Sequence, residues 1–189
     1  MKTPVAIATI ALAAVAFTQG CASGGHAGSA AAAPGAPGSR PASPAESRAM
    51  FEKFKSIEGD WTGTSTKGWT ERISYKVIAN GSAVLESSFD AHPGEQMLTL
   101  IHPDGDRLML THYCAAKNQP RLVLTQVKDN GNTAVFEFLD ATNLPSRDKG
   151  HMDKVVFTFK DANTFTDQWT WYEKGKESWM EEIVNTRAK

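Results

Sequence analysis

The chain has 189 residues, which is compatible with one folded domain and appended segments. Its 20 basic and 21 acidic residues are well mixed and give a net charge of -1, so no basic stripe is available for a phosphate backbone. We therefore predict no nucleic-acid partner. The spacing of the two cysteines, Cys21 and Cys114, fits no zinc ribbon, thioredoxin-type pair or haem-attachment motif.

The N-terminus predicts export. Met1-Lys2 is a minimal positive start, and residues 5–17 form an almost purely apolar run. That run is shorter than the roughly 20 residues needed to span a bilayer, and it is typical of a secretory signal peptide.

Thr18-Gln19-Gly20-Cys21 resembles a bacterial lipobox, in which the cysteine becomes diacylated. We predict a lipoprotein-type signal peptide over residues 1–21, lipidation at Cys21, and a membrane anchor at the periplasmic face of the outer membrane. The alternative is ordinary cleavage after Ala14-Val15-Ala16, which would leave Cys21 as a free thiol and the protein periplasmic or secreted.

Residues 22–42 are almost entirely Ala, Gly, Ser and Pro. Such a segment has too few apolar side chains to bury a core, and we predict a disordered linker. The folded domain is then predicted to span residues 43–189.

The domain begins with a predicted helix over about residues 44–55. Ser43, Pro44 and Glu46 form a capping box with proline at the first helical position. Apolar residues that share one helical face follow, and this face is expected to cover an end of the domain: Met50, Phe51, Phe54 and Ile57.

From Trp61 onward, strand-like runs alternate with turn sequences, and no second helix is predicted. Asn80-Gly81 and Asn130-Gly131 are strong hairpin signals because tight hairpin turns need positive φ. Short connections make successive strands neighbours, and closing such a sheet removes its exposed edges. We predict an all-β fold, a single antiparallel up-and-down barrel of about ten strands, at residues 60–66, 70–79, 83–90, 97–102, 107–114, 121–128, 133–139, 154–160, 164–172 and 177–185.

Alternation of side chains supports this prediction. Phe165, Asp167, Trp169 and Trp171 share one face of a strand, since side chains alternate along it. A barrel of this size is not filled by its own side chains, so a cavity is expected.

At Gly59-Asp60-Trp61 the chain resembles the calycins, the superfamily of lipocalins and fatty-acid-binding proteins. With the segment 110–114, it also resembles a family of exported bacterial lipocalin-like domains of unknown function. The resemblance implies a ligand-holding barrel with Trp61 plugging one end. The related nitrobindins bind haem through a late histidine, but no histidine follows His151 here, and we predict no cofactor.

His112 and Cys114 are two residues apart on a predicted strand and share a face. They could act as a base and a thiolate nucleophile, or they could be a buried thiol and a hydrogen-bonded histidine lining the cavity. No oxyanion motif accompanies them, and we assign no catalytic residue. We also predict no metal site, because no histidine cluster with ligand spacing is evident.

The loop after this strand contains Asn118, Gln119 and Arg121, which could hydrogen-bond the carboxylate or head group of a ligand at the barrel mouth. Alternatively, Arg121 pairs with a surface acid. The long segment 140–153 is interpreted as a lid. Trp169 and Trp171 belong either to the core or to the cavity wall.

Three functions remain open. The first is an exported, lipid-anchored barrel that binds a small apolar or amphipathic molecule, and this is our prediction. The others are an envelope enzyme using His112 with Cys114, and a ligand-free structural barrel. The predicted ligand-binding residues are Trp61, His112, Cys114, Asn118, Arg121, Trp169 and Trp171.

Overall fold

The structure is a computed structural model that describes residues 42–91 and 95–189. The predicted signal peptide, Cys21 and all but the last residue of the predicted linker lie outside the described residues. The described part contains one α-helix and ten strands: α1 (Pro44–Ser56), β1 (Gly59–Ser65), β2 (Thr70–Ile78), β3 (Ala83–Ala91), β4 (Glu95–Asp104), β5 (Arg107–Tyr113), β6 (Gln119–Lys128), β7 (Thr133–Thr142), β8 (His151–Asp161), β9 (Thr164–Glu173) and β10 (Lys176–Arg187).

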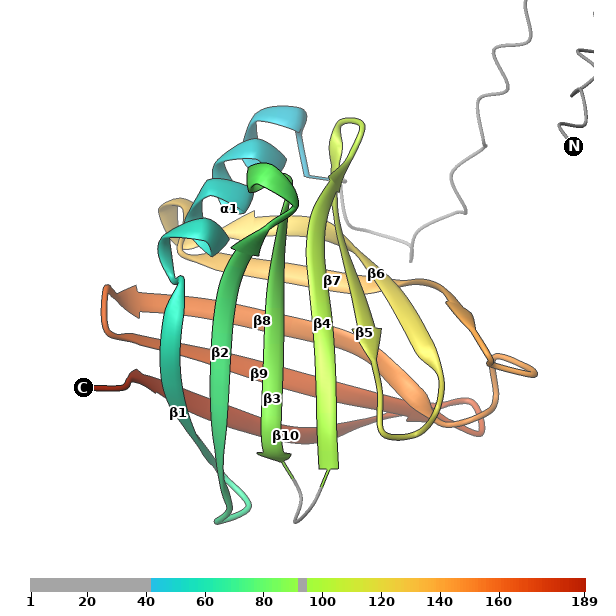
Figure 1. Ribbon diagram of the computed structural model, residues 1–189. Helices are drawn as coiled ribbons and strands as arrows, with labels where there is room; N and C mark the ends of the chain where they lie inside the picture. The colour runs from blue at the N-terminus through green and yellow to red at the C-terminus, as the bar shows by residue number, and fades with distance from the viewer. Residues whose placement is uncertain (1–41, 92–94) are drawn as a thin grey trace, which may run out of the picture. The chain divides into compact units, whose positions relative to one another are not determined.

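The ten strands form a closed antiparallel barrel in which each strand pairs with its neighbours in the chain (Figure 1). The ring closes where β1 pairs with β10, with Trp61 opposite Arg187 and Ser65 opposite Ile183. Every strand therefore has a partner on both sides, and the sheet has no free edge. The predicted all-β, ten-stranded up-and-down barrel is confirmed.

Two of the hairpin turns have the same left-handed backbone. Ala79–Gly81 and Asp129–Gly131 connect β2 to β3 and β6 to β7, and their central asparagines have φ of 55° and 54°. Asparagine and glycine adopt this conformation at little cost, which is why the Asn-Gly pairs predicted turns at these positions.

The helix α1 covers one end of the barrel, which we call the closed end (Figure 1). Its predicted capping box is present, with the Ser43 N–H donating to Glu46 Oε2 at 2.6 Å. The Phe54 ring is fully buried and makes edge contacts with rings from β7 and β8, with centroid distances of 5.0–6.0 Å: Phe136, Phe157 and Phe159.

Trp61 lies at this closed end, where it was predicted to act as a plug. Its indole N–H donates to the Ile57 carbonyl at 2.9 Å, and its ring contacts Phe165 at 4.8 Å between centroids. The Arg187 guanidinium lies over the same indole at 4.3 Å. The tryptophan thereby joins the end of the helix to the first, ninth and tenth strands.

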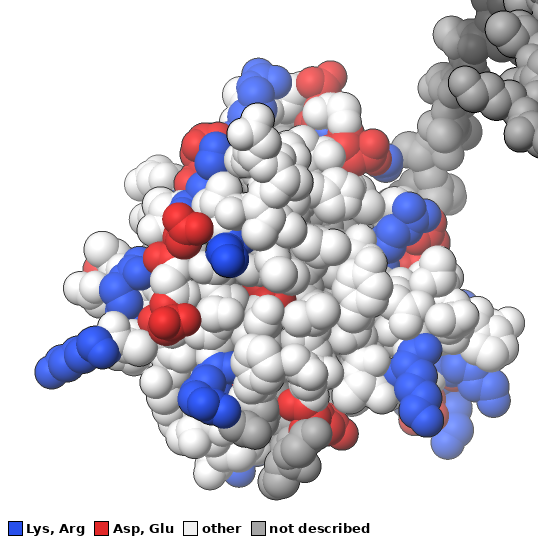
Figure 2. Space-filling view, viewed as in Figure 1, with Lys and Arg blue, Asp and Glu red and all other residues white. Residues whose placement is uncertain are grey.

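The surface carries both signs of charge. On the face in Figure 2, Lys and Arg side chains are interspersed with Asp and Glu. Within residues 42–91 and 95–189, no helix has the length and apolar character needed to cross a bilayer.

Candidate functional site

The interior of the barrel contains a cavity of about 340 Å³ on the side away from α1. We call this part of the barrel the cavity half. Its wall comes from the inward faces of the strands and from the loop after β5, and consists of Trp69, Glu71, Glu86, Ser88, Glu95, Met97, His112, Cys114, Ala115, Ala116, Met152, Asp167, Trp169, Trp171, Met180, Glu181 and Ile183. The cavity expected from the strand count is present.

On some strands the inward column of side chains changes from apolar to acidic along the strand. On β9 the column runs from Phe165 at the closed end through Asp167 to Trp169. On β2 it runs from Tyr75 through Ile73 to Glu71. Because every second side chain of a strand faces the interior, carboxyl groups that follow the aromatic and aliphatic residues at this spacing also face inward.

Four inward carboxyl groups gather at the cavity wall, and neutral side chains donate hydrogen bonds to them. The Ser88 hydroxyl donates to Glu71, and the Ser65 hydroxyl donates to Glu181 at 2.6 Å. Asp167 accepts from the Trp169 indole N–H at 2.7 Å and from the Asn185 amide.

Gly63 makes room for this arrangement. A Cβ at Gly63 would lie 2.9 Å from Glu71 Cγ and 3.1 Å from Asn185 Oδ1. Glycine on β1 thus allows side chains from β2 and β10 to approach across the strand between them.

A row of polar residues crosses four adjacent strands at matching register. Tyr75 on β2 is opposite Glu86 on β3, Glu86 is opposite Thr99 on β4, and Thr99 is opposite His112 on β5. The Tyr75 and Thr99 hydroxyls hydrogen-bond the Glu86 carboxyl. The Thr99 hydroxyl also lies 3.1 Å from His112 Nδ1, so the row is continuous.

Burial shifts the acid–base behaviour of three of these carboxyl groups. It raises the pKa of Glu71 to about 7, of Glu86 to about 8 and of Asp167 to about 7, against the opposing effect of their hydrogen bonds. The other carboxyl groups of the cluster raise these values further, because adjacent negative charges repel. Glu71, Glu86 and Asp167 therefore gain and lose protons around neutral pH.

His112 is the histidine that lines the cavity. Burial lowers its pKa to about 4, so the imidazole is neutral at neutral pH. Its ring lies against Trp169, 4.8 Å between centroids. The side chain is 4% exposed, and its Nε2, buried at the cavity wall, has no hydrogen-bond partner among the described residues.

Cys114 also lines the cavity, as a free thiol. Burial raises its pKa, which keeps the sulfur protonated at neutral pH and unreactive as a nucleophile. Since His112 Nδ1 faces Thr99 and Nε2 is unbonded, no hydrogen bond in the described chain joins the imidazole to the thiol. The geometry corresponds to the alternative of a partly buried thiol beside a hydrogen-bonded histidine.

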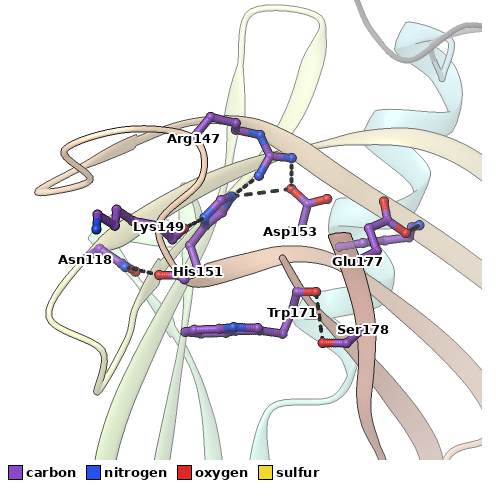
Figure 3. A network of polar contacts seen from close by, with 10 residues as sticks. Asn118, Arg147, Lys149, His151, Asp153, Trp171, Glu177 and Ser178 are labelled. Carbon is purple, nitrogen blue, oxygen red and sulfur yellow. Dashed lines mark hydrogen bonds and ion pairs between the residues drawn. The ribbon is translucent and has the colours of Figure 1, made fainter. Parts of the chain in front are cut away.

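A polar network holds the loop between β7 and β8 (Figure 3). His151 Nδ1 donates to the Lys149 carbonyl at 2.6 Å, so Nε2 carries the lone pair that accepts from Arg147. Arg147 also pairs with Asp153, whose side chain is 7% exposed. The guanidinium lies over two rings at 4.3 and 3.8 Å: Phe138 and Tyr172.

The same loop contacts the cavity wall. The Asn118 amide donates to the Gly150 carbonyl at 2.9 Å, tying the loop to the segment after β5 (Figure 3). A Cβ at Gly150 would lie 2.2 Å from Trp171 Cζ2, so the glycine backbone packs directly on this indole. The segment predicted as a lid is thus anchored beside the cavity; its action as a lid stays a prediction.

The structure brings together four of the seven predicted ligand-binding residues. His112, Cys114, Trp169 and Trp171 line the cavity. The other three lie elsewhere: Trp61 is buried at the closed end, Asn118 bonds the β7–β8 loop, and Arg121 forms a two-point ion pair with Asp140 on the outside of the barrel. For Arg121, the alternative of a surface pair is the one observed.

Sequence reasoning missed the four interior carboxyl groups as site residues. Asp167 was placed on the same strand face as Phe165 and Trp169, and the structure shows that this face points inward. The same two-residue period on β2, β3 and β10 places Glu71, Glu86 and Glu181 inward too. In the described ranges, no group of three or more His, Cys, Asp and Glu side chains is arranged to hold a metal ion.

The sequence matches no protein-family model, and no curated protein is found to be similar to it. A ten-stranded barrel does not by itself identify a calycin family, so that resemblance stays a prediction.

Proposed function

We propose that this protein is an exported, lipid-anchored β-barrel that binds a small amphipathic molecule in the cavity half. The observation that carries the proposal is the cavity of about 340 Å³ inside the closed ring, which has a mixed wall of tryptophan, methionine and polar side chains. This volume lies at the lower end of the range of small-molecule sites, roughly 300–1,000 Å³. It has room for on the order of ten water molecules, and hence for a ligand of about a dozen non-hydrogen atoms.

The wall suits an amphipathic guest. Trp69, Trp169 and Met97 offer apolar surface, whereas the carboxyl groups and His112 offer a few convergent polar contacts. Such a combination orients a ligand while burying most of its surface. Catalysis by His112 and Cys114 has less support, because the two groups are not hydrogen-bonded and the thiol stays protonated.

The test has two parts. Native mass spectrometry of the mature protein, purified gently from bacterial envelopes, is expected to show a bound small molecule. Titration calorimetry with tryptophol, a neutral indole alcohol, is expected to show binding with a Kd on the order of 10 µM to 1 mM.

A matched pair of variants locates the binding. Ala116→Trp places a bulky side chain at the cavity wall, whereas Ala162→Trp places the same side chain on the exposed turn between β8 and β9. We expect at least a tenfold loss of tryptophol affinity in the first variant and no change in the second. A clean native mass together with no tryptophol binding would contradict the proposal and favour a ligand-free structural barrel.

A further inference from the structure

The polar part of the cavity wall consists of hydrogen-bond acceptors with little positive charge to balance them. Among its described lining residues five are acidic and none is lysine or arginine. The hydrogen bonds that reach Glu71, Glu86 and Asp167 come from hydroxyl, amide and indole donors, all of them neutral. An acidic cluster alone does not define a ligand site, but here a second feature points the same way.

That second feature is the unbonded nitrogen of His112. When Glu86 is ionised, the single hydroxyl proton of Thr99 is donated to that carboxylate, so Thr99 Oγ1 accepts from His112 Nδ1–H. The neutral imidazole then presents the lone pair of Nε2 at the cavity wall. Glu86 Oε2 is shielded from solvent and also lacks a hydrogen-bond partner among the described residues. Two buried acceptors, on residues that lie on either side of Thr99, therefore lack a donor in the part of the chain that the structure describes.

Aromatic walls complete the arrangement. Trp69, Trp169 and Trp171 line the cavity together with the carboxyl groups. Indole faces attract cations through the negative face of the ring, and aromatic cages are a recurrent means of binding ammonium groups.

We propose that the ligand is an organic cation, a small flat apolar molecule bearing an ammonium group whose N–H bonds reach Glu86 and His112 Nε2. This inference rests on the proposed function and specifies its ligand class. An ammonium group supplies three donors and one positive charge, which matches the vacant acceptors and the acidic wall. A carboxylate or phosphate ligand would instead add negative charge to a wall whose described lining residues include five acids and no lysine or arginine.

Binding of a cation must then be linked to proton release. The titratable groups facing the cluster are Tyr75, His112, Glu95 and Cys114, with Glu182 acting on Asp167 from β10. Of the whole set, Glu71, Glu86 and Asp167 titrate between about pH 7 and 8. The cation favours their ionised forms, so its affinity rises with pH, by about tenfold between pH 6 and 8 for one proton released near pH 7.

Three indoles that differ in their terminal group test the proposal: tryptamine, tryptophol and indole-3-acetate. Titration calorimetry at pH 8 is expected to give at least tenfold tighter binding of tryptamine than of the other two. Tryptamine keeps its own charge over pH 6–8, since alkylammonium groups titrate near pH 10. Repeating the titration in buffers of different ionisation enthalpy is expected to show proton release.

Charge-neutralising variants locate the ammonium group. Glu86→Gln is expected to weaken tryptamine binding about tenfold at pH 8, more than it weakens tryptophol binding, and to reduce the pH dependence of tryptamine binding. Asp167→Asn serves as a second variant, and circular dichroism checks that each one folds. Glu173→Gln, at the exposed end of β9, removes the same charge outside the cavity and is expected to have no effect.

The outcomes separate the two proposals. If tryptophol or indole-3-acetate binds as tightly as tryptamine, or if tryptamine affinity does not rise with pH, the cation inference is wrong and binding in the cavity stands. If none of the three indoles binds, and the native mass is clean, the binding function fails with it.

Discussion

The closed end and the cavity half are built from the same strands, yet different kinds of side chain face the interior in the two regions. At the closed end, Phe54, Phe136 and Phe157 fill the interior with edge-to-face rings under the helix. In the cavity half, carboxyl groups and a neutral histidine surround open space. The difference indicates that the closed end provides the packing energy that allows the other half to stay hollow and polar.

This contrast matters because buried carboxyl groups and unfilled volume both reduce stability. A barrel with such an interior throughout would be poorly stable. Here the hydrogen-bonded ring of strands and the aromatic closed end hold the unfavourable groups in place, as in many proteins whose binding sites are stabilised by the rest of the fold.

The largest expected effect is at the closed end. Phe54→Ala removes a fully buried ring that contacts three others, and we expect a loss of about 3–5 kcal/mol in unfolding free energy. Urea denaturation followed by tryptophan fluorescence measures it.

Met152→Ala provides the comparison in the cavity half. Its side chain already borders open space, so truncation creates less new cavity, and we expect a loss of about 1–2 kcal/mol. Equal losses in the two variants would show that the closed end is not the main source of packing energy.

The next effect is a decrease in stability with rising pH. Glu71, Glu86 and Asp167 have raised pKa values of about 7, 8 and 7 in the folded protein, so between pH 5 and 8.5 the folded state holds protons that the unfolded chain has released. The unfolded state is therefore increasingly favoured over this range. We expect the unfolding free energy to fall by at least about 3 kcal/mol over this range, measured by urea denaturation at a series of pH values.

Glu86→Gln tests the origin of that dependence. Because glutamine does not ionise, the variant is expected to be about 1–2 kcal/mol more stable than the parent at pH 8.5, and its stability is expected to change less with pH. A stability that rises between pH 5 and 8.5 would contradict the assignment of raised pKa values to these groups.

The smallest effect concerns two arginine ion pairs. Arg147 contacts His151, Asp153 and two rings at the β7–β8 loop, so Arg147→Ala is expected to cost about 1–2 kcal/mol. Arg121→Ala breaks an exposed pair with Asp140 and is expected to change stability by no more than about 0.5 kcal/mol. Thermal unfolding of both variants decides this, and a larger loss in Arg121→Ala would reverse the ranking.

Much of the fold could be predicted from the sequence. The Asn-Gly turns, the alternation on strands such as β9, and the capping box at Ser43 are local signals, and local signals identify elements and their order. Closure into a barrel also followed, because ten short strands with short connections leave few other arrangements.

The site was only partly predictable because it depends on register between strands. The row Tyr75, Glu86, Thr99 and His112 exists only when four strands align at those residues, and no local signal sets that alignment. Similarly, the sequence left two possible partners for Arg121, a ligand or a surface acid. Only the pairing of β6 with β7 placed Asp140 beside it.

The junction of β1 with β10 has a consequence for how the chain reaches its final form. The Ala188 N–H donates to the Asp60 carbonyl at 2.8 Å, and the Arg187 side chain bonds the Glu58 carbonyl, so the first and last parts of the sheet meet directly. Until residues 176–187 have been synthesised, β1 and β9 each expose an unpaired edge, and such edges invite association with other chains. The ring can therefore close only once the last strand is available, which makes the end of the chain decisive for removing both edges.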